Sequence, residues 1–105
     1  MTDLTPQQLD AQKLAEACGA TMYERDNAAQ ALDITLEEIH PGYARMKMSV
    51  RKDMINSLNV CHGGMIFLLA DTTFGYACNS HNQVTMALGC SIDYINPARL
   101  SVPVR

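Results

Sequence analysis

The fold of this chain is decided by residues 62–78, which read HGGMIFLLADTTFGYAC. Residues 65–70 carry no polar side chain, and a helix that is apolar on every face is normally buried in a core. We expect Asp71, which follows directly, to lie in or beside a buried environment, where an ionised carboxylate is costly without partners. Gly63 and Gly64 leave backbone N–H groups uncovered at the start of this helix, where they can receive a developing negative charge.

Two interpretations of Asp71 follow from these residues. An oxyanion site beside a perturbed carboxylate is the equipment of an acyl-transfer enzyme. In the structural alternative, Asp71 binds the backbone or a core hydroxyl such as that of Thr72 or Thr73, and the glycines only let the helix pack closely on a sheet. Perturbed carboxylates also occur in structural networks, so the residues alone leave both interpretations open.

Length and composition limit the class of protein. The chain has 105 residues, of which 48% are hydrophobic and 18% charged, which is typical of one globular domain over residues 1–105. The net charge of -3 and the absence of a basic cluster argue against nucleic acid as a partner. The first residues lack the pattern of a signal peptide, and no apolar run is long enough to cross a bilayer. We therefore expect a cytoplasmic protein without a membrane partner.

The four cysteines show neither Cys-x-x-Cys pairs nor a histidine at zinc-site spacing, so we expect no metal site and no disulfide scaffold. Cys61 next to His62 suggests a Cys–His nucleophile as a weak alternative, because neighbours in sequence rarely face each other.

Local patterns predict the order of the elements. A capping box at Thr5-Pro6-Gln7-Gln8 begins a helix that we expect to stop at Gly19, with a second helical piece over residues 20–26. Alternating apolar residues predict strands over residues 32–37 and 43–50, joined by a turn at Pro41-Gly42. The apolar helix should cover residues 63–79, followed by a long third strand over residues 84–94 and the beginning of a fourth after Pro97.

These elements predict an α+β fold in which an antiparallel sheet wraps one long buried helix. Three or four strands would leave a sheet edge unpaired and part of the helix uncovered. We therefore expect further strands to be missing at the C-terminus, which would make the domain incomplete there.

Two motifs carry a resemblance to a known family. They are Asn56-x5-His62-Gly63-Gly64-x6-Asp71 and, one expected strand later, residues 93–98, which read DYINPA. This pattern resembles the hotdog-fold acyl-CoA thioesterases, with the phenylacetate-degradation (PaaI) type as the nearest match, and it covers nearly the whole chain. The resemblance implies a hotdog fold and hydrolysis of an acyl-CoA thioester. Coenzyme A is then part of the substrate, and no separate cofactor is implied.

The resemblance also implies roles for single residues. Asp71 matches the carboxylate that attacks the thioester or activates water, and the N–H of Gly63 matches the group that polarises the carbonyl. Asn56 matches the residue that holds the water or the carboxylate. His62 would orient the loop and steady the carbonyl region, and its structural alternative is a capping role at the start of the helix. Gly64 and Thr72 are expected to contact the substrate. In the family a Ser or Thr can help to hold water at the position of Ala87, so that role is empty or moved here.

The spacing of these residues favours a site shared between two subunits. Gly63 and Asp71 are eight residues apart on one helix, which separates them by roughly 12 Å at a rise of about 1.5 Å per residue. One scissile carbonyl cannot touch both within one chain. This agrees with the resemblance, which implies a homodimer or homotetramer with sites across an interface.

The sequence thus predicts a thioesterase acting on an aryl-acetyl-CoA, such as phenylacetyl- or hydroxyphenylacetyl-CoA, or on a medium or short acyl-CoA. The alternative is a catalytically silent hotdog-fold subunit or an acyl-CoA-binding module. A hotdog dehydratase ranks third, because those enzymes show a different pattern around a catalytic histidine. The sequence does not distinguish between the acyl groups.

Overall fold

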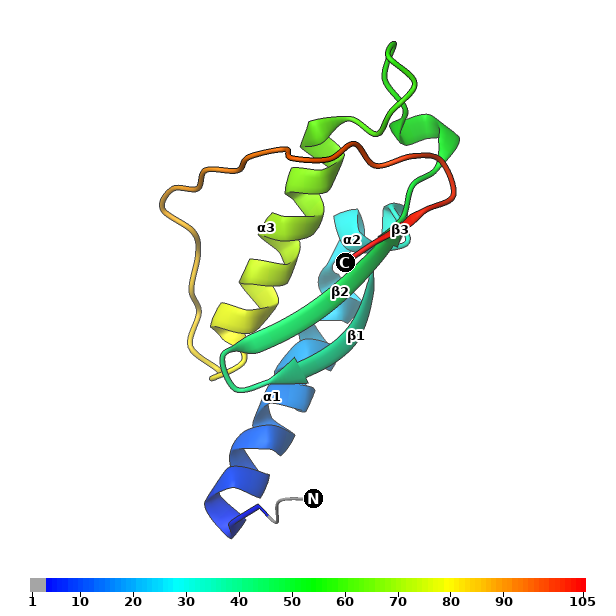
Figure 1. Cartoon of the computed structure of the whole chain (residues 1–105). Coiled ribbons are helices and arrows are strands. Elements are labelled where there is room, and N and C mark those ends of the chain that lie inside the picture. Colours follow the sequence, from blue (N-terminus) through cyan, green and yellow to red (C-terminus); the bar gives the residue numbers. More distant parts are fainter. Residues whose placement is uncertain (1–3) are drawn as a thin grey trace.

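The structure is a computed structural model that describes residues 4–105. Three helices, α1 (Pro6–Arg25), α2 (Asn27–Ala31) and α3 (Gly63–Asn79), pack with a small antiparallel sheet. The sheet has the order β1-β2-β3, with β1 at Thr35–His40, β2 at Tyr43–Ser49 and β3 at Pro103–Val104. Figure 1 shows α1 and α3 running beside the β1–β2 hairpin, which confirms the predicted combination of one long helix with an antiparallel sheet.

The first helix begins as predicted but does not stop at Gly19. The Thr5 hydroxyl accepts from the N–H of Gln8 at 3.2 Å, and the Gln8 side chain accepts from the N–H of Thr5 at 2.7 Å. Gly19 is instead a buried residue inside α1, where an added Cβ would lie 3.0 Å from side-chain atoms of both Leu36 and Ile39. This glycine therefore serves close packing of the helix on β1, and one helix replaces the two predicted pieces.

The first strand begins later than residue 32, so that boundary was also wrong. The carboxylate of Asp26 accepts from the N–H of Ala29 at 3.1 Å and caps the short helix α2, which ends with Leu32 as its C-cap. Asp33 then adopts a left-handed conformation, with φ of 53°, that turns the chain into β1. The Asp26 cap stabilises α2, so that Leu32 ends a helix and does not begin a strand, and the alternating pattern of apolar residues does not reveal this cap.

The predicted hairpin and its turn are confirmed. β1 pairs with β2 in antiparallel register from Thr35 opposite Lys47 to His40 opposite Tyr43, with an irregularity between Leu36 and Glu38. Gly42 in the turn has a φ of 75°, a value that glycine adopts without strain. Its N–H donates to the hydroxyl of buried Ser80 at 2.7 Å, so the turn is tied to the end of α3.

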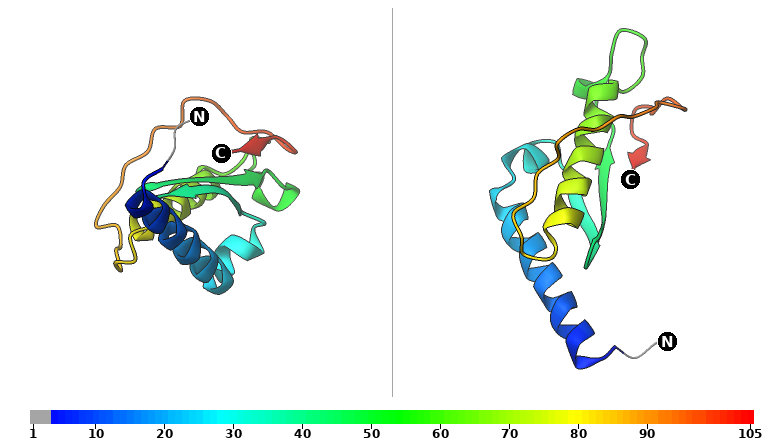
Figure 2. Two further views of the ribbon diagram at one scale, coloured as in Figure 1. Left: turned by 90° about the horizontal axis from the view of Figure 1, so that it is seen from below. Right: turned by 90° about the vertical axis from the view of Figure 1, so that its left-hand side faces the viewer.

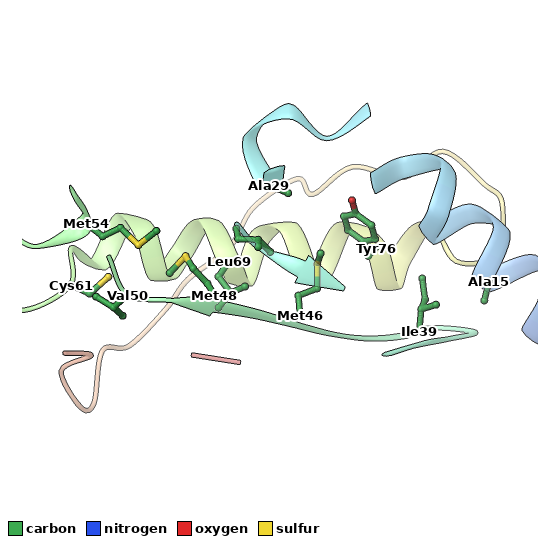
Figure 3. Packing of buried hydrophobic residues seen from close by; sticks show 11 residues of the cluster. Ala15, Ala29, Ile39, Met46, Met48, Val50, Met54, Cys61, Leu69 and Tyr76 are labelled. Atoms are coloured by element: carbon green, nitrogen blue, oxygen red, sulfur yellow. The ribbon is translucent and has the colours of Figure 1, made fainter. Parts of the chain in front are cut away.

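The helix α3 has the predicted bounds, but it is only partly covered. The core lies between this helix, α1 and the sheet, as Figure 3 shows. Its buried hydrophobic residues are Ala15, Ala29, Ile34, Ile39, Met46, Met48, Val50, Met54, Cys61, Leu69 and Tyr76. Only Leu69 and Tyr76 of α3 belong to this set, and the opposite side of the helix, with Ala70, Asp71 and Phe74, is exposed. No helix within residues 4–105 is long and apolar enough to span a membrane.

The long third strand predicted over residues 84–94 is wrong. This segment has no regular secondary structure, and Val84, Met86 and Leu88 are almost fully exposed. Figures 1 and 2 show the segment leaving one end of α3, swinging away from the body and returning across the other end of the helix. A strand needs a neighbouring strand for its backbone hydrogen bonds. Within residues 4–105, the edge of β2 that does not face β1 pairs only with β3, through Met48 and Ser49. The fourth strand is thus confirmed only as the short β3.

A buried tyrosine joins α3 to the junction of α1 and α2. Tyr76 is 1% exposed, and its hydroxyl donates to Oδ2 of Asp26 at 3.1 Å, while Oδ1 of the same carboxylate caps α2. Burial, and after it the negative charge of Asp26, raise the pKa of Tyr76 well above its ordinary value. The phenol therefore stays protonated and remains a hydrogen-bond donor.

Removing this hydroxyl should destabilise the fold. We expect Tyr76→Phe to lower the free energy of unfolding by about 1–2 kcal/mol, because the hydrogen bond is lost and a carboxylate acceptor is left without its donor. Urea unfolding followed by circular dichroism measures the shift. Tyr43→Phe is the matched control, since Tyr43 is half exposed and its hydroxyl has no partner among the described residues. Equal midpoints for the two variants would contradict the structural role of the Tyr76–Asp26 bond.

Candidate active site

Asn56 lies in a tight loop directly before α3. Its side-chain Oδ1 accepts from the N–H of Leu58 at 2.9 Å and from the N–H of Val60 at 3.2 Å. The backbone closes the same loop, because the N–H of Asn56 donates to the carbonyl of Val60 at 2.8 Å. Because Oδ1 already accepts these two hydrogen bonds, the side-chain amide can bind a further group only as a donor, through Nδ2. Nδ2 has no acceptor among residues 4–105.

The approach to this loop is anchored on the other side by Arg51. Its guanidinium donates to the Ala31 carbonyl and to Asp33, both at 3.0 Å, and to the two carboxylate oxygens of Asp53 at 3.0 and 2.9 Å. The Arg51 hydrogen bond lowers the pKa of Asp53. Further along, the N–H of His62 donates to the Met54 carbonyl at 2.8 Å. These bonds hold Asn56 and the start of α3 together, and residues 56–64 are called the corner below.

The N-terminus of α3 is open. His62 occupies the N-cap position, but its exposed side chain makes no capping hydrogen bond. Its carbonyl accepts from Met65 and Ile66, whereas the N–H groups of Gly63 and Gly64 have no acceptor within residues 4–105. Two free N–H groups at the positive end of a 17-residue helix are suited to an oxygen that gains negative charge.

Asp71 is exposed, so the expectation of a buried carboxylate is wrong for the single chain. The cause is the incomplete cover of α3, whose outward side carries Asp71. The structural alternative, in which Asp71 binds the backbone or a core hydroxyl, is also not supported by any contact. The hydroxyl of Thr73 donates to the Leu69 carbonyl at 2.7 Å, and the Asp71 carboxylate has no hydrogen-bond partner among residues 4–105. Thr72, beside it, is half buried.

Cys61 does not have the properties of a nucleophile. Its side chain is 4% exposed, and its Sγ donates to the carbonyl of His62 at 3.5 Å. Burial raises the pKa of the thiol, which keeps it protonated, whereas a nucleophilic cysteine needs the thiolate. The neighbouring His62 side chain is exposed, so the weak Cys–His alternative gains no support.

Two hollows flank α3, and neither is lined by Asn56, His62, Gly63 or Asp71. The larger, about 630 Å³, lies between α1 and residues 79–85. The smaller, about 290 Å³, runs along α3 beside Val104 and Arg105. Its α3 lining consists of Ile66, Leu69, Ala70, Thr73, Phe74 and Ala77. The second hollow lies on the side of α3 that faces β3, and Asp71 is not part of its lining.

The predicted site residues thus fall into two groups. Asn56, His62, Gly63 and Gly64 gather at one end of α3, while Asp71 and Thr72 lie two turns further along the helix. The sequence prediction missed Tyr94, whose ring contacts Gly63. Tyr94 belongs to the second motif, residues 93–98, but nothing in the local pattern indicates what its side chain touches.

Comparisons with known proteins agree with this fold. The sequence model of the thioesterase superfamily matches residues 58–105. Acyl-coenzyme A thioesterase PaaI of Escherichia coli (strain K12) is 45% identical over 76 residues, which are 72% of this chain and 54% of the relative. A putative esterase of Archaeoglobus fulgidus is 44% identical over 77 residues, which are 73% of this chain and 50% of that protein.

The solved structure of the E. coli PaaI protein, from the phenylacetic acid degradation operon, is similar with a TM-score of 0.87 and 38% identity. The match covers 89% of this chain and 67% of that structure. The long helix α3, which begins with a glycine pair and packs on an antiparallel sheet, therefore forms the hotdog arrangement. The chain belongs to the thioesterase superfamily. It spans about half the length of the curated relatives that it matches.

Proposed function

We propose that this protein hydrolyses the thioester bond of an acyl-coenzyme A to the free acid and coenzyme A. The observation that carries the proposal is the 45% identity to a relative named as an acyl-coenzyme A thioesterase. The open N-terminus of α3 and the accessible carboxylate of Asp71 supply chemistry that suits this reaction. The proposed acyl group is aryl-acetyl, such as phenylacetyl or hydroxyphenylacetyl, or a medium or short aliphatic chain. No separate cofactor takes part.

The first step in the proposed mechanism is polarisation of the thioester carbonyl. Its oxygen binds at the N–H groups of Gly63 and Gly64, where the positive end of the helix stabilises the charge that develops. Asn56 adds a donor beside this position, because its Oδ1 is held by the loop and its Nδ2 hydrogens are free. His62 fixes the corner through its backbone bond to Met54.

Asp71 then drives the attack on the carbonyl carbon, either directly as the nucleophile or as the base that activates a water molecule. The C–S bond breaks, and coenzyme A leaves as a thiol after it gains a proton. Water supplies the new oxygen of the acid, at once or when it hydrolyses the acyl-aspartyl intermediate. Thr72 is proposed to contact the substrate beside Asp71.

Two copies of the chain are needed to assemble this site. Within one copy Gly63 and Asp71 are about 12 Å apart along a straight helix. Asp71 is exposed, as are Ala70 and Phe74 on the same side of α3, so a second copy can approach this side. We propose a homodimer, alone or paired into a homotetramer, in which Asp71 of one copy serves the Gly63 corner of the other.

Release of free thiol from a panel of acyl-CoA substrates tests this function. The panel holds phenylacetyl-, hydroxyphenylacetyl-, benzoyl- and medium-chain acyl-CoA, and the Asp71→Asn variant serves as the control for contaminating esterases. We expect release by the wild-type protein, with an aryl-acetyl or medium-chain substrate favoured. Binding of acyl-CoA without thiol release would instead support the catalytically silent binding module.

A further inference from the structure

The aromatic ring of Tyr94 occupies the space next to Gly63. A Cβ placed on Gly63 would lie 2.8 Å from Cζ of Tyr94 and 3.1 and 3.2 Å from its two Cε atoms. A Cβ on Gly64 would meet nothing within 4 Å. The ring therefore packs against one side of the first turn of α3 and leaves the other side open.

The position of this ring depends on packing and on one nearby anchor. Tyr94 is 52% exposed, and its hydroxyl has no hydrogen-bond partner within residues 4–105. Backbone hydrogen bonds are absent from residues 86–97, but the N–H of Cys61 donates to the carbonyl of Ala98 at 2.8 Å. Because Cys61 directly precedes His62, this bond ties the segment that carries Tyr94 to the corner that carries the glycines. Figure 1 shows the segment crossing the end of α3 there.

We propose that Tyr94 is a positioning residue for the thioester. Its ring forms a wall on the Gly63 side of the helix N-terminus, so that the carbonyl oxygen reaches the free N–H groups from the Gly64 side only. The missing side chain at residue 63 makes room for the ring. This role rests on the proposed function, and it concerns the direction of approach, with no proton transferred by the phenol.

Four variants test the wall. Tyr94→Ala removes it, and we expect kcat to fall about 10- to 100-fold, because a displacement of about 1 Å can cost as much as 100-fold. Tyr94→Phe keeps the ring and should retain kcat within about twofold. Gly63→Ala keeps the N–H but pushes the ring away, so it should lose a similar factor. The Tyr94→Ala/Gly63→Ala double variant should lose no more than either single variant, since both remove one and the same contact.

Two further readouts separate this role from a structural one. Ile95→Ala, which removes an exposed side chain from the same segment, should leave kcat unchanged. In a ¹H–¹⁵N spectrum the Gly64 amide should shift in Tyr94→Ala and in Gly63→Ala, and stay in place in Tyr94→Phe, because an aromatic ring shifts nearby protons. Wild-type kcat in Tyr94→Ala, or additive losses in the double variant, would overturn the wall while leaving the proposed function intact. If the wild-type protein released no thiol from acyl-CoA, both the proposed function and the wall would be overturned, whatever the shift of the Gly64 amide.

Discussion

Asp71→Asn is expected to lower kcat by about 10²–10⁴-fold, the usual cost of losing a general base, while the fold is kept. Asparagine preserves the shape of the side chain but can neither attack the carbonyl nor take a proton from water. Asp71 is exposed and has no partner in the described residues, so its replacement removes no structural contact. Initial rates of thiol release, with thermal unfolding of the same preparations, measure both effects.

Asp10→Asn is the matched control for this variant, because Asp10 is also an exposed acid on a helix. It should keep the wild-type rate. If Asp71→Asn retained more than half of the wild-type kcat, the assignment of Asp71 would be wrong, and a different group would have to activate the nucleophile.

Asn56→Ala and Asn56→Asp are expected to lower kcat by about 10²-fold, with a smaller effect on KM. Loss of one donor to a developing oxyanion costs about 10²–10³-fold, and such a donor acts mainly in the transition state. The aspartate variant makes the test sharp. Its carboxylate can still accept from the N–H groups of Leu58 and Val60, but it lacks the Nδ2 donor.

The comparison of these two variants separates catalysis from loop structure. Full activity in Asn56→Asp together with loss in Asn56→Ala would show that Asn56 only closes the loop. A change confined to KM in both variants would make it a substrate-binding residue. Steady-state kinetics with one acyl-CoA substrate distinguishes these outcomes.

The sequence predicted those elements that depend on local signals. The α3 bounds follow from the glycine pair and the apolar run, and the hairpin follows from alternation around Pro41-Gly42. The failures at Gly19 and at residues 84–94 have a different origin. Gly19 packs against a strand distant in sequence, and an alternating pattern does not show whether a strand has a neighbour to pair with.

The same division applies to the candidate site. Asn56, His62 and Gly63 are close in sequence, so their common corner could be expected, and the helix rise fixes how far away Asp71 must be. The sequence predicted that part of α3 would stay uncovered, but not that Asp71 lies on the uncovered side, because this depends on how α1 and the sheet pack against the helix. The Tyr94–Gly63 contact depends on the path of residues 84–98, which local pattern does not determine.

The most direct test of the shared site is to mix Asp71→Asn subunits with Asn56→Ala subunits. Each variant alone should be nearly inactive, whereas a mixed dimer contains one site with both residues intact. Under conditions in which subunit exchange is demonstrated by mass spectrometry, we expect thiol-releasing activity to return, up to about one quarter of the wild-type rate for random pairing of dimers. No recovery despite proven exchange would contradict a site built from Asp71 of one copy and the Asn56–Gly63 corner of another.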